Sequence, residues 1–151
     1  MKSRVPTALF VAGVLAGCSG IKTYPDTRPK NLRVHTAVSG AGAALDVHRV
    51  GASCEIEYQG TVQLDSSSVE IGLPAERPSY VVFRFYSSSF LTGSRRSLSY
   101  GTLIRPRAGY TYDVKLSYGD DMYNVSIREI DPRKPYSREL ERRDLSTCKA
   151  P

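Results

Sequence analysis

The chain has few of the residues on which many catalytic chemistries depend. Its 151 residues include no tryptophan, two histidines and three cysteines. The cysteines stand at positions 18, 54 and 148, too far apart for the closely spaced ligand pairs of a zinc site. Neither a glycine-rich phosphate-binding pattern nor a Gly-x-Ser-x-Gly nucleophile elbow is present. We therefore predict no cofactor, no metal site and no catalytic residue, in a protein that is not an enzyme.

The sequence also has no apolar run at its N-terminus long enough to span a bilayer. The stretch from Val5 to Leu15 is eleven residues long and is broken by Pro6 and Thr7, whereas a membrane-spanning helix needs about 20 residues. Lys2 and Arg4 precede it. A short apolar run behind positive charge is typical of a signal peptide.

The residues after this run resemble the lipobox of bacterial lipoproteins. They are Leu15, Ala16, Gly17 and Cys18. The resemblance implies cleavage before Cys18 and lipidation of its thiol, with diacylglycerol and fatty acyl chains such as palmitate. Ser19 follows, and the absence of Asp there favours the outer membrane, facing the periplasm. The alternative is an ordinary secretory signal with a chance cysteine.

The two other cysteines form a natural pair in an oxidising compartment. Disulfides persist in the periplasm, and Cys54 lies in the apolar phase of its predicted strand. A Cys54 to Cys148 bridge would close a loop of more than 90 residues, worth about 4 to 5 kcal/mol at most in the chain-entropy model. The alternative is two free thiols.

From Leu32 onwards, apolar and polar residues alternate with period two, the signature of half-buried strands. One apolar face is predicted for Cys54, Ile56, Tyr58, Val62 and Leu64, and Gly60, which interrupts it, indicates a bulge or a bend. Tyr80 to Tyr86 is apolar except for one arginine and predicts the most central strand, buried on both faces along much of its length. For 137–145, a short helix and an edge strand both remain open. The predicted strands lie within 32–38, 45–48, 54–64, 69–73, 80–86, 98–102, 110–118 and 123–128.

This pattern predicts an all-β fold, an antiparallel β-sandwich of seven or eight strands with an immunoglobulin-like or transthyretin-like topology. Small lipoproteins of secretion machines, such as the transthyretin-like one of the type VI system, share this layout. The expected organisation is a signal peptide (1–17), a lipidated Cys18 with a flexible tether (18–31), and one β-sandwich domain (32–151).

Charge is spread unevenly along the chain. Residues 43–77 carry six acidic and two basic residues, whereas 78–112 carry five arginines and no acid. One interpretation is that pairs across neighbouring strands neutralise these segments. The other is a basic patch that faces an anionic partner.

The segment 87–96 is longer than a hairpin loop needs, and it places Phe90 and Leu91 beside arginines. The residues proposed for partner contact are Phe90, Leu91, Arg95, Arg96, Arg105 and Arg107, the arginines forming one patch at one end of the sandwich. The alternative is a loop that folds back as a lid. The expected partners are the membrane, through lipid on Cys18, and a protein or an anionic envelope polymer, but not nucleic acid.

These features predict a membrane-anchored periplasmic lipoprotein that acts as a binding or structural module of the cell envelope. One alternative is a component of an envelope secretion or assembly complex. Another is an envelope hydrolase, for which His35 and His48 are the candidate bases. Both histidines lie at polar positions of predicted strands, with no catalytic motif around them.

Overall fold

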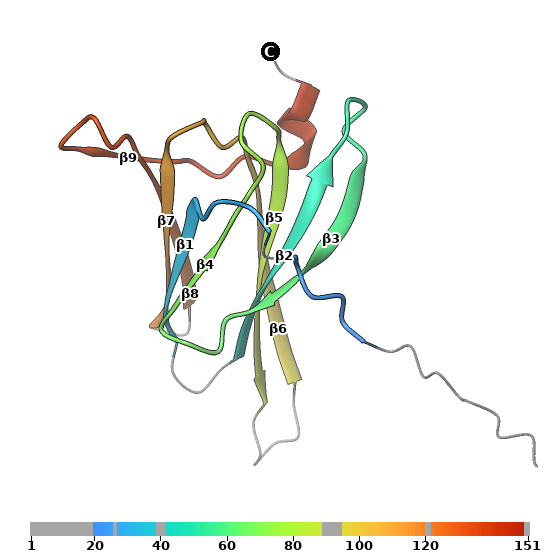
Figure 1. Ribbon diagram of the computed structural model, residues 1–151. Coiled ribbons are helices and arrows are strands. Elements are labelled where there is room, and N and C mark those ends of the chain that lie inside the picture. The colour runs from blue at the N-terminus through green and yellow to red at the C-terminus, as the bar shows by residue number, and fades with distance from the viewer. Residues whose placement is uncertain (1–19, 26, 39–41, 89–94, 120–121, 150–151) are drawn as a thin grey trace, which may run out of the picture.

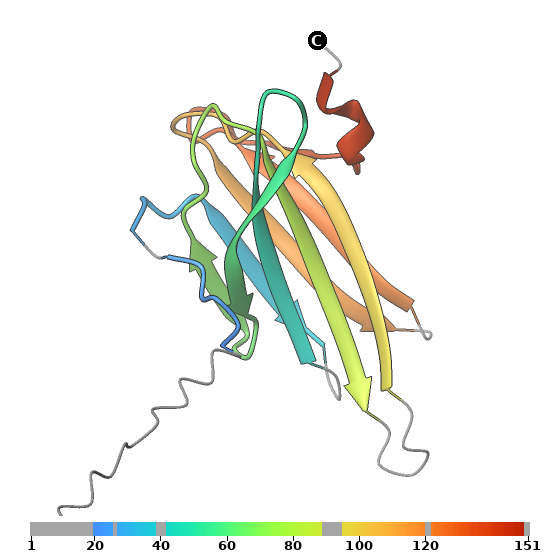
Figure 2. The same ribbon diagram turned by 90° about the vertical axis from the view of Figure 1, so that its right-hand side faces the viewer.

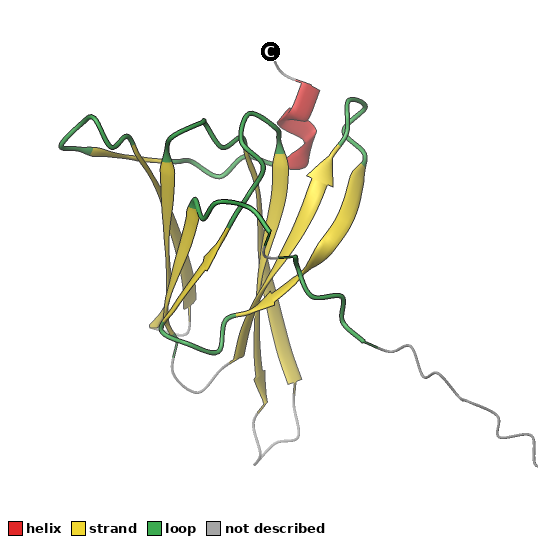
Figure 3. Cartoon of the chain, viewed as in Figure 1, coloured by secondary structure: helices red, strands yellow, loops and turns green. Residues whose placement is uncertain are grey.

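The computed structural model describes residues 20–25, 27–38, 42–88, 95–119 and 122–149. In this part of the chain, strands form two sheets packed face to face, and a 3-10 helix follows them (Figures 1 and 3). The elements are β1 (Leu32–Ala37), β2 (Gly42–Val50), β3 (Ile56–Gln63), β4 (Ser68–Ile71), β5 (Ser79–Ser88), β6 (Arg95–Ile104), β7 (Thr111–Gly119), β8 (Met122–Ile130), β9 (Ser137–Glu139) and the 3-10 helix η1 (Leu145–Lys149). No helix among the described residues is long and apolar enough to cross a bilayer.

The predicted β-sandwich is confirmed, with one parallel pair of strands in it. The five-stranded sheet has the order β4-β1-β7-β8-β9, and the four-stranded sheet has the order β3-β2-β5-β6. The pair β7 and β8 is the hairpin that the alternation predicted, with Tyr118 opposite Tyr123. β1 pairs with β7 in parallel, Leu32 opposite Tyr112, whereas its partner on the other side, β4, is antiparallel.

The core lies between the two sheets and is made of alternate residues of each strand. Phe83 and Tyr112, from opposite sheets, are completely buried. Burial of apolar surface of this kind is the main term that stabilises the fold. The other most fully buried apolar side chains of the core are Leu32, Val34, Leu45, Val47, Leu73, Val81, Phe85, Val114 and Leu116.

The prediction that the strand at Tyr80 to Tyr86 is buried on both faces is wrong. β5 is an inner strand of its sheet, but only its odd-numbered residues, such as Val81 and Phe83, point into the core. Tyr80 and Val82 lie on the outer face and are half-buried. The apolar run therefore combines a core face with an outer face of tyrosine and valine.

Gly60 is the site of the predicted bulge. Val47 pairs with Gly60 and His48 with Tyr58, so one extra residue is inserted in β3. Gly60 has a φ of 152°, and a Cβ there would lie 2.5 Å from the backbone of Tyr24, which excludes other residues without strain.

Because of this bulge, the face predicted from the alternation is wrong for the first half of β3. Ile56 and Tyr58 were expected on the core side with Val62, but they lie on the outer face of the four-stranded sheet, 44% and 38% exposed. Cys54 is not in a strand at all. It lies in the turn between β2 and β3 with a φ of 66°.

The upper end of the sandwich in Figure 1 holds the loops 51–55, 72–78, 105–110 and 131–136. Cys54 and Cys148 are joined there in the predicted disulfide, with Cα atoms 5.9 Å apart. The bridge ties η1 to the β2–β3 turn, and both lie above the sheets in Figure 2. The open question about 137–145 is answered by the short edge strand β9, followed by irregular chain up to η1.

The expected flexible tether is wrong for the described part of 18–31. Tyr24 is only 5% exposed. Its N–H donates to the carbonyl of Thr61, the Thr61 N–H donates to the carbonyl of Lys22, and the Tyr24 hydroxyl donates to the carbonyl of Gly72. This segment is therefore packed along β3, and it belongs to the domain.

Candidate functional site

The sequence-predicted arginine patch is divided between the two ends of the sandwich. Arg95 and Arg96 are not in a loop. They are the first two residues of β6 and pair with Ser88 and Ser87 of β5. Arg105 follows the other end of that strand. The ten residues of β6 separate the pair Arg95 and Arg96 from Arg105 by about 30 Å. The prediction that these arginines form one shared patch is therefore wrong. Phe90 and Leu91, like Cys18, lie outside the described residues.

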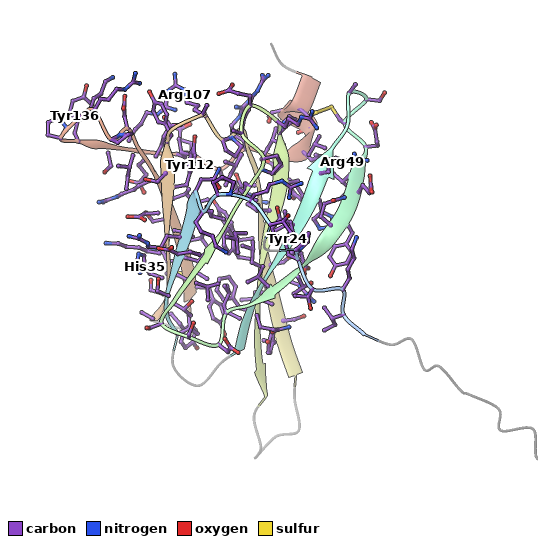
Figure 4. The ribbon with its side chains drawn as sticks, viewed as in Figure 1. Tyr24, His35, Arg49, Arg107, Tyr112 and Tyr136 are labelled. Carbon is purple, nitrogen blue, oxygen red and sulfur yellow. A yellow bond between two sulfur atoms is a disulfide. The ribbon has the colours of Figure 1, made fainter. Side chains whose placement is uncertain are left out.

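Arg107 belongs to a group of charged and aromatic side chains at the upper end, which we call the arginine-tyrosine cluster. It comes from the loops 105–110 and 131–136 and from the adjoining ends of β8 and β9 (Figure 4). A hollow of about 160 Å³ lies among most of these side chains. The cluster consists of Arg107, Tyr110, Glu129, Asp131, Arg133, Lys134, Tyr136 and Arg138.

Glu129 is the buried centre of the cluster, only 6% exposed. It accepts hydrogen bonds from the Tyr112 hydroxyl (2.9 Å), from Arg138 (2.9 Å) and from Arg107 (3.3 Å). The Tyr112 oxygen in turn accepts the backbone N–H of Arg107 (2.9 Å). Burial, with a smaller contribution from the Glu129 carboxylate, raises the pKa of Tyr112 to about 12. Tyr112 therefore stays protonated and donates to Glu129.

Asp131 forms a second buried centre beside the first. The backbone N–H and the guanidinium of Arg133 donate to its carboxylate, and the Tyr110 hydroxyl donates to it at 3.0 Å. The Arg133 hydrogen bonds hold the pKa of Asp131 well below its usual range. The carboxyl group is therefore ionised throughout the physiological range.

The two carboxylates lie beneath the cations that they hold. The side chains of Glu129 and Asp131 are 7% and 6% exposed, whereas those of Arg107, Arg138 and Arg133 are 54%, 66% and 75% exposed. The surface offered to solvent is therefore cationic, although each arginine has an internal partner.

Aromatic rings support the same arginines. The guanidinium of Arg107 lies 4.7 Å from the centroid of the Tyr110 ring, and that of Arg133 lies 5.8 Å from it. Lys134 lies 5.7 Å from the centroid of Tyr136. Stacked guanidinium groups keep further N–H donors, which bind carboxylate or phosphate groups in a bidentate manner. The arrangement is therefore suited to binding an anionic group.

A second hollow, of about 430 Å³, opens beside β2 and β3 at the same end. Arg28 donates to the Tyr24 hydroxyl in its wall, and Arg49 pairs with Glu57. Burial raises the pKa of Tyr24 more than Arg28 lowers it. The carboxylate that pairs with Arg49 is exposed (58%), whereas the carboxylates of the arginine-tyrosine cluster are buried.

The outer face of the four-stranded sheet carries an aromatic row that includes a candidate catalytic base. The His48 ring lies 5.5 Å from the ring of Tyr58 and 6.2 Å from that of Tyr80. Burial lowers the pKa of His48, and Asp46 partly opposes this. His48 thus packs between tyrosines. His35 is half-buried on β1, opposite Ser68 and Lys115.

Of the cations of the arginine-tyrosine cluster, only Arg107 was predicted from the sequence. Arg133, Lys134 and Arg138 lie in a charged, proline-broken segment that carries no periodic signal. Glu129 follows Val125 and Ile127 in the alternation of its strand, a signal that would have placed it on the inward face, where it meets Tyr112. Only the pairing of β7 with β8 places the two opposite each other.

Comparisons with known proteins yield a likeness of strand arrangement. No family model and no curated protein matches the chain. Among solved structures, transthyretin from Sparus aurata has 12% identity and a TM-score of 0.45, covering 66% of this chain and 97% of that chain. Sea bream transthyretin in complex with thyroxine has 14% identity and a TM-score of 0.43, and the match covers 64% of this chain and 93% of that chain.

Proposed function

We propose that this protein is a lipid-anchored, non-catalytic module of the bacterial cell envelope that binds an acidic partner through the arginine-tyrosine cluster. The observation that supports the partner is the exposure of three arginines above two buried carboxylates. The anchor is proposed from the resemblance of Leu15 to Cys18 to a lipobox. The partner is a protein or an envelope polymer that bears carboxylate or phosphate groups.

The buried carboxylates favour binding because they order the arginines in advance. A free arginine loses side-chain entropy when a ligand immobilises it, which reduces affinity. Arg107, Arg133 and Arg138 are already held by Glu129 or Asp131 and, in two cases, by the Tyr110 ring. Arginine and tyrosine are also the residues in which binding hot spots are enriched.

Retention of the full-length lipoprotein, purified in detergent, on immobilised polyglutamate tests the site. The variant Arg133→Glu with Lys134→Glu should elute at lower salt than the wild type, because exposed charge attraction is screened over about 8 Å at physiological ionic strength. The matched control is Arg95→Glu with Arg96→Glu, which makes the same change in formal charge at the opposite end.

The comparison of the two double variants decides between the sites. A much larger loss of retention in the Arg133 and Lys134 variant supports binding by the cluster. Equal losses in both variants mean that net charge alone governs retention, and they contradict the proposal. Thermal melting of both proteins establishes that each is folded.

A further inference from the structure

We infer that the face of the domain around the outer edge of β3 rests on the lipid surface that holds the anchor. This membrane face consists of Ile21, Lys22, Ile56 and Tyr58. The inference rests on the lipid anchor of the proposed function, and it adds how the domain is oriented on the bilayer.

The first argument is the short length of chain between the anchor and the domain. The carbonyl of Lys22 accepts the N–H of Thr61 at 2.7 Å, so Lys22 is fixed on β3. Lys22 is four positions after Cys18, with three residues between them, and four extended steps of the chain span at most about 14 Å. An anchored Cys18 therefore keeps this edge of β3 close to the headgroups, and the domain has no tether on which to move away.

The second argument is the chemistry of the side chains at this edge. Ile21 is 63% exposed, Ile56 44% and Tyr58 38%. The Tyr58 hydroxyl donates to the carbonyl of Lys22 at 3.2 Å, so these residues are neighbours. Exposed aliphatic side chains favour the boundary of the hydrocarbon region, tyrosine is enriched at the interface, and lysine is attracted to anionic headgroups.

Two acidic residues beside this face, Asp46 and Glu57, are paired with arginines and oppose contact with a negative surface little. Asp46 is held by Arg84 and also accepts a hydrogen bond from the Thr61 hydroxyl. Glu57 is paired with Arg49. Glu55, next to Ile56, is exposed and accepts the backbone N–H of Ser53. The bulge at Gly60 is what brings Ile56 and Tyr58 to the outer face, where they are available to lipid.

This orientation determines where the arginine-tyrosine cluster points. β3 is one outer strand of the four-stranded sheet, and β9 is an outer strand of the other sheet. The two lie on opposite sides of the molecule in Figure 1, and Tyr136 lies on the side away from Tyr24 and Arg49 in Figure 4. A domain resting on its β3 edge therefore presents the cluster away from the bilayer, to a partner other than the lipids of that membrane.

Tryptophan fluorescence tests this orientation well, because the chain has no tryptophan of its own. The full lipoprotein is reconstituted into vesicles of phosphatidylethanolamine and phosphatidylglycerol that include brominated phosphatidylcholine as a quencher. Three variants are compared: Tyr58→Trp on the membrane face, Tyr136→Trp beside the cluster, and Met122→Trp, an exposed apolar position (68%) on β8 in the other sheet.

We expect emission from Tyr58→Trp to shift to the blue and to be quenched several-fold more than emission from Met122→Trp or Tyr136→Trp. Equal quenching at all three positions, in protein that floats with the vesicles, overturns the membrane face and leaves the anchor intact. Strong quenching of Tyr136→Trp that depends on phosphatidylglycerol overturns it as well, since the cluster would then face the lipid. Failure of the wild-type lipoprotein to float overturns the anchor and the membrane face together.

Discussion

At the scale of single residues, Tyr112 and Glu129 connect the core to the proposed binding surface. Tyr112 is completely buried among apolar side chains, yet its hydroxyl donates to Glu129 and accepts a backbone N–H from the loop that carries Arg107. Buried polar groups in such networks are costly to leave unpaired. The position of Arg107 therefore depends on a residue that contacts no solvent.

We predict that Tyr112→Phe lowers the free energy of unfolding by about 1 to 3 kcal/mol, because one buried carboxylate loses a donor and one backbone N–H loses its acceptor. Urea denaturation of wild type and variant measures the difference. Tyr136→Phe, at a position 65% exposed, is the control and should change the value little. An unchanged stability of Tyr112→Phe would show that the network does not hold the loop.

The lowered pKa of His48 makes the stability of the domain depend on pH, with a sign that follows from the direction of the shift. The folded state lowers this pKa mainly by burial, and an unfolded histidine titrates near about 6.5. As pH falls through that value, the unfolded chain takes up the proton first, so stability decreases toward acid. The effect is modest, because His48 is only half-buried.

We predict that His48→Phe, which keeps a ring between Tyr58 and Tyr80, flattens the fall in unfolding free energy between about pH 7 and pH 5. Denaturation of both proteins across this range measures the two slopes. If the slopes coincide, the decline in acid has another origin, such as protonation of the paired carboxylates.

At the scale of elements, the C-terminal segment is held by β9, by hydrogen bonds of Arg142 and Arg143 to β6 and by one covalent bond. β9 pairs with three residues of β8, and beyond it the Leu103 N–H donates to the carbonyl of Arg143. The Cys54 to Cys148 bridge closes this segment onto the β2–β3 turn across 94 residues. Arg138 of the arginine-tyrosine cluster precedes this segment, so the disulfide restrains the chain directly after the cluster.

We predict that Cys148→Ser lowers the melting temperature by on the order of 10 °C, because the bridge removes entropy from the unfolded chain. Calorimetry of the variant and of reduced wild type should agree. Two thiols that react with an alkylating reagent in native, unreduced protein would show that the bridge is not formed.

The elements also show what the sequence can and cannot reveal. The hairpin of β7 and β8 was predicted because each apolar side chain alternates with a polar one, a signal that depends only on neighbours in the chain. The bulge at Gly60 was predicted, but its effect on Ile56 and Tyr58 was not, since a one-residue shift reverses the face. The parallel pairing of β1 with β7 joins residues 80 apart, and local patterns carry no information about it.

The candidate site was less predictable than the fold for the same reason. Arg107 was identified from a stretch rich in arginine, but Glu129 and Asp131 were not, because acidic residues are rarely buried and their arginine partners come from separate segments, the loops 105–110 and 131–136 and β9. Arg95 and Arg105 are close in sequence and were assigned to one patch. β6 begins at Arg95 and ends at Ile104, directly before Arg105, so its length places the two arginines at opposite ends of the sandwich.

At the scale of the whole molecule, the proposed membrane face and the arginine-tyrosine cluster lie on opposite sides (Figures 1 and 4). We predict that Cys18→Ala abolishes incorporation of a fatty acid probe, because the thiol is the proposed point of lipid attachment. Metabolic labelling of cells that produce wild type and variant measures this. Labelling of the variant as strong as that of the wild type would show that the lipid is attached elsewhere.

The central claim is that an acidic envelope partner binds the cluster, and site-specific photo-crosslinking in cells tests it most directly. A photoreactive residue replaces Tyr136 in the lipidated protein, with the same residue at Met122 as the reference position. The account predicts a discrete adduct from position 136 that Lys134→Glu weakens several-fold and that Arg33→Gln, which breaks an ion pair with Glu70 on β4, leaves unchanged. Adducts that are equal at the two positions, or that persist unchanged in Lys134→Glu, would contradict it.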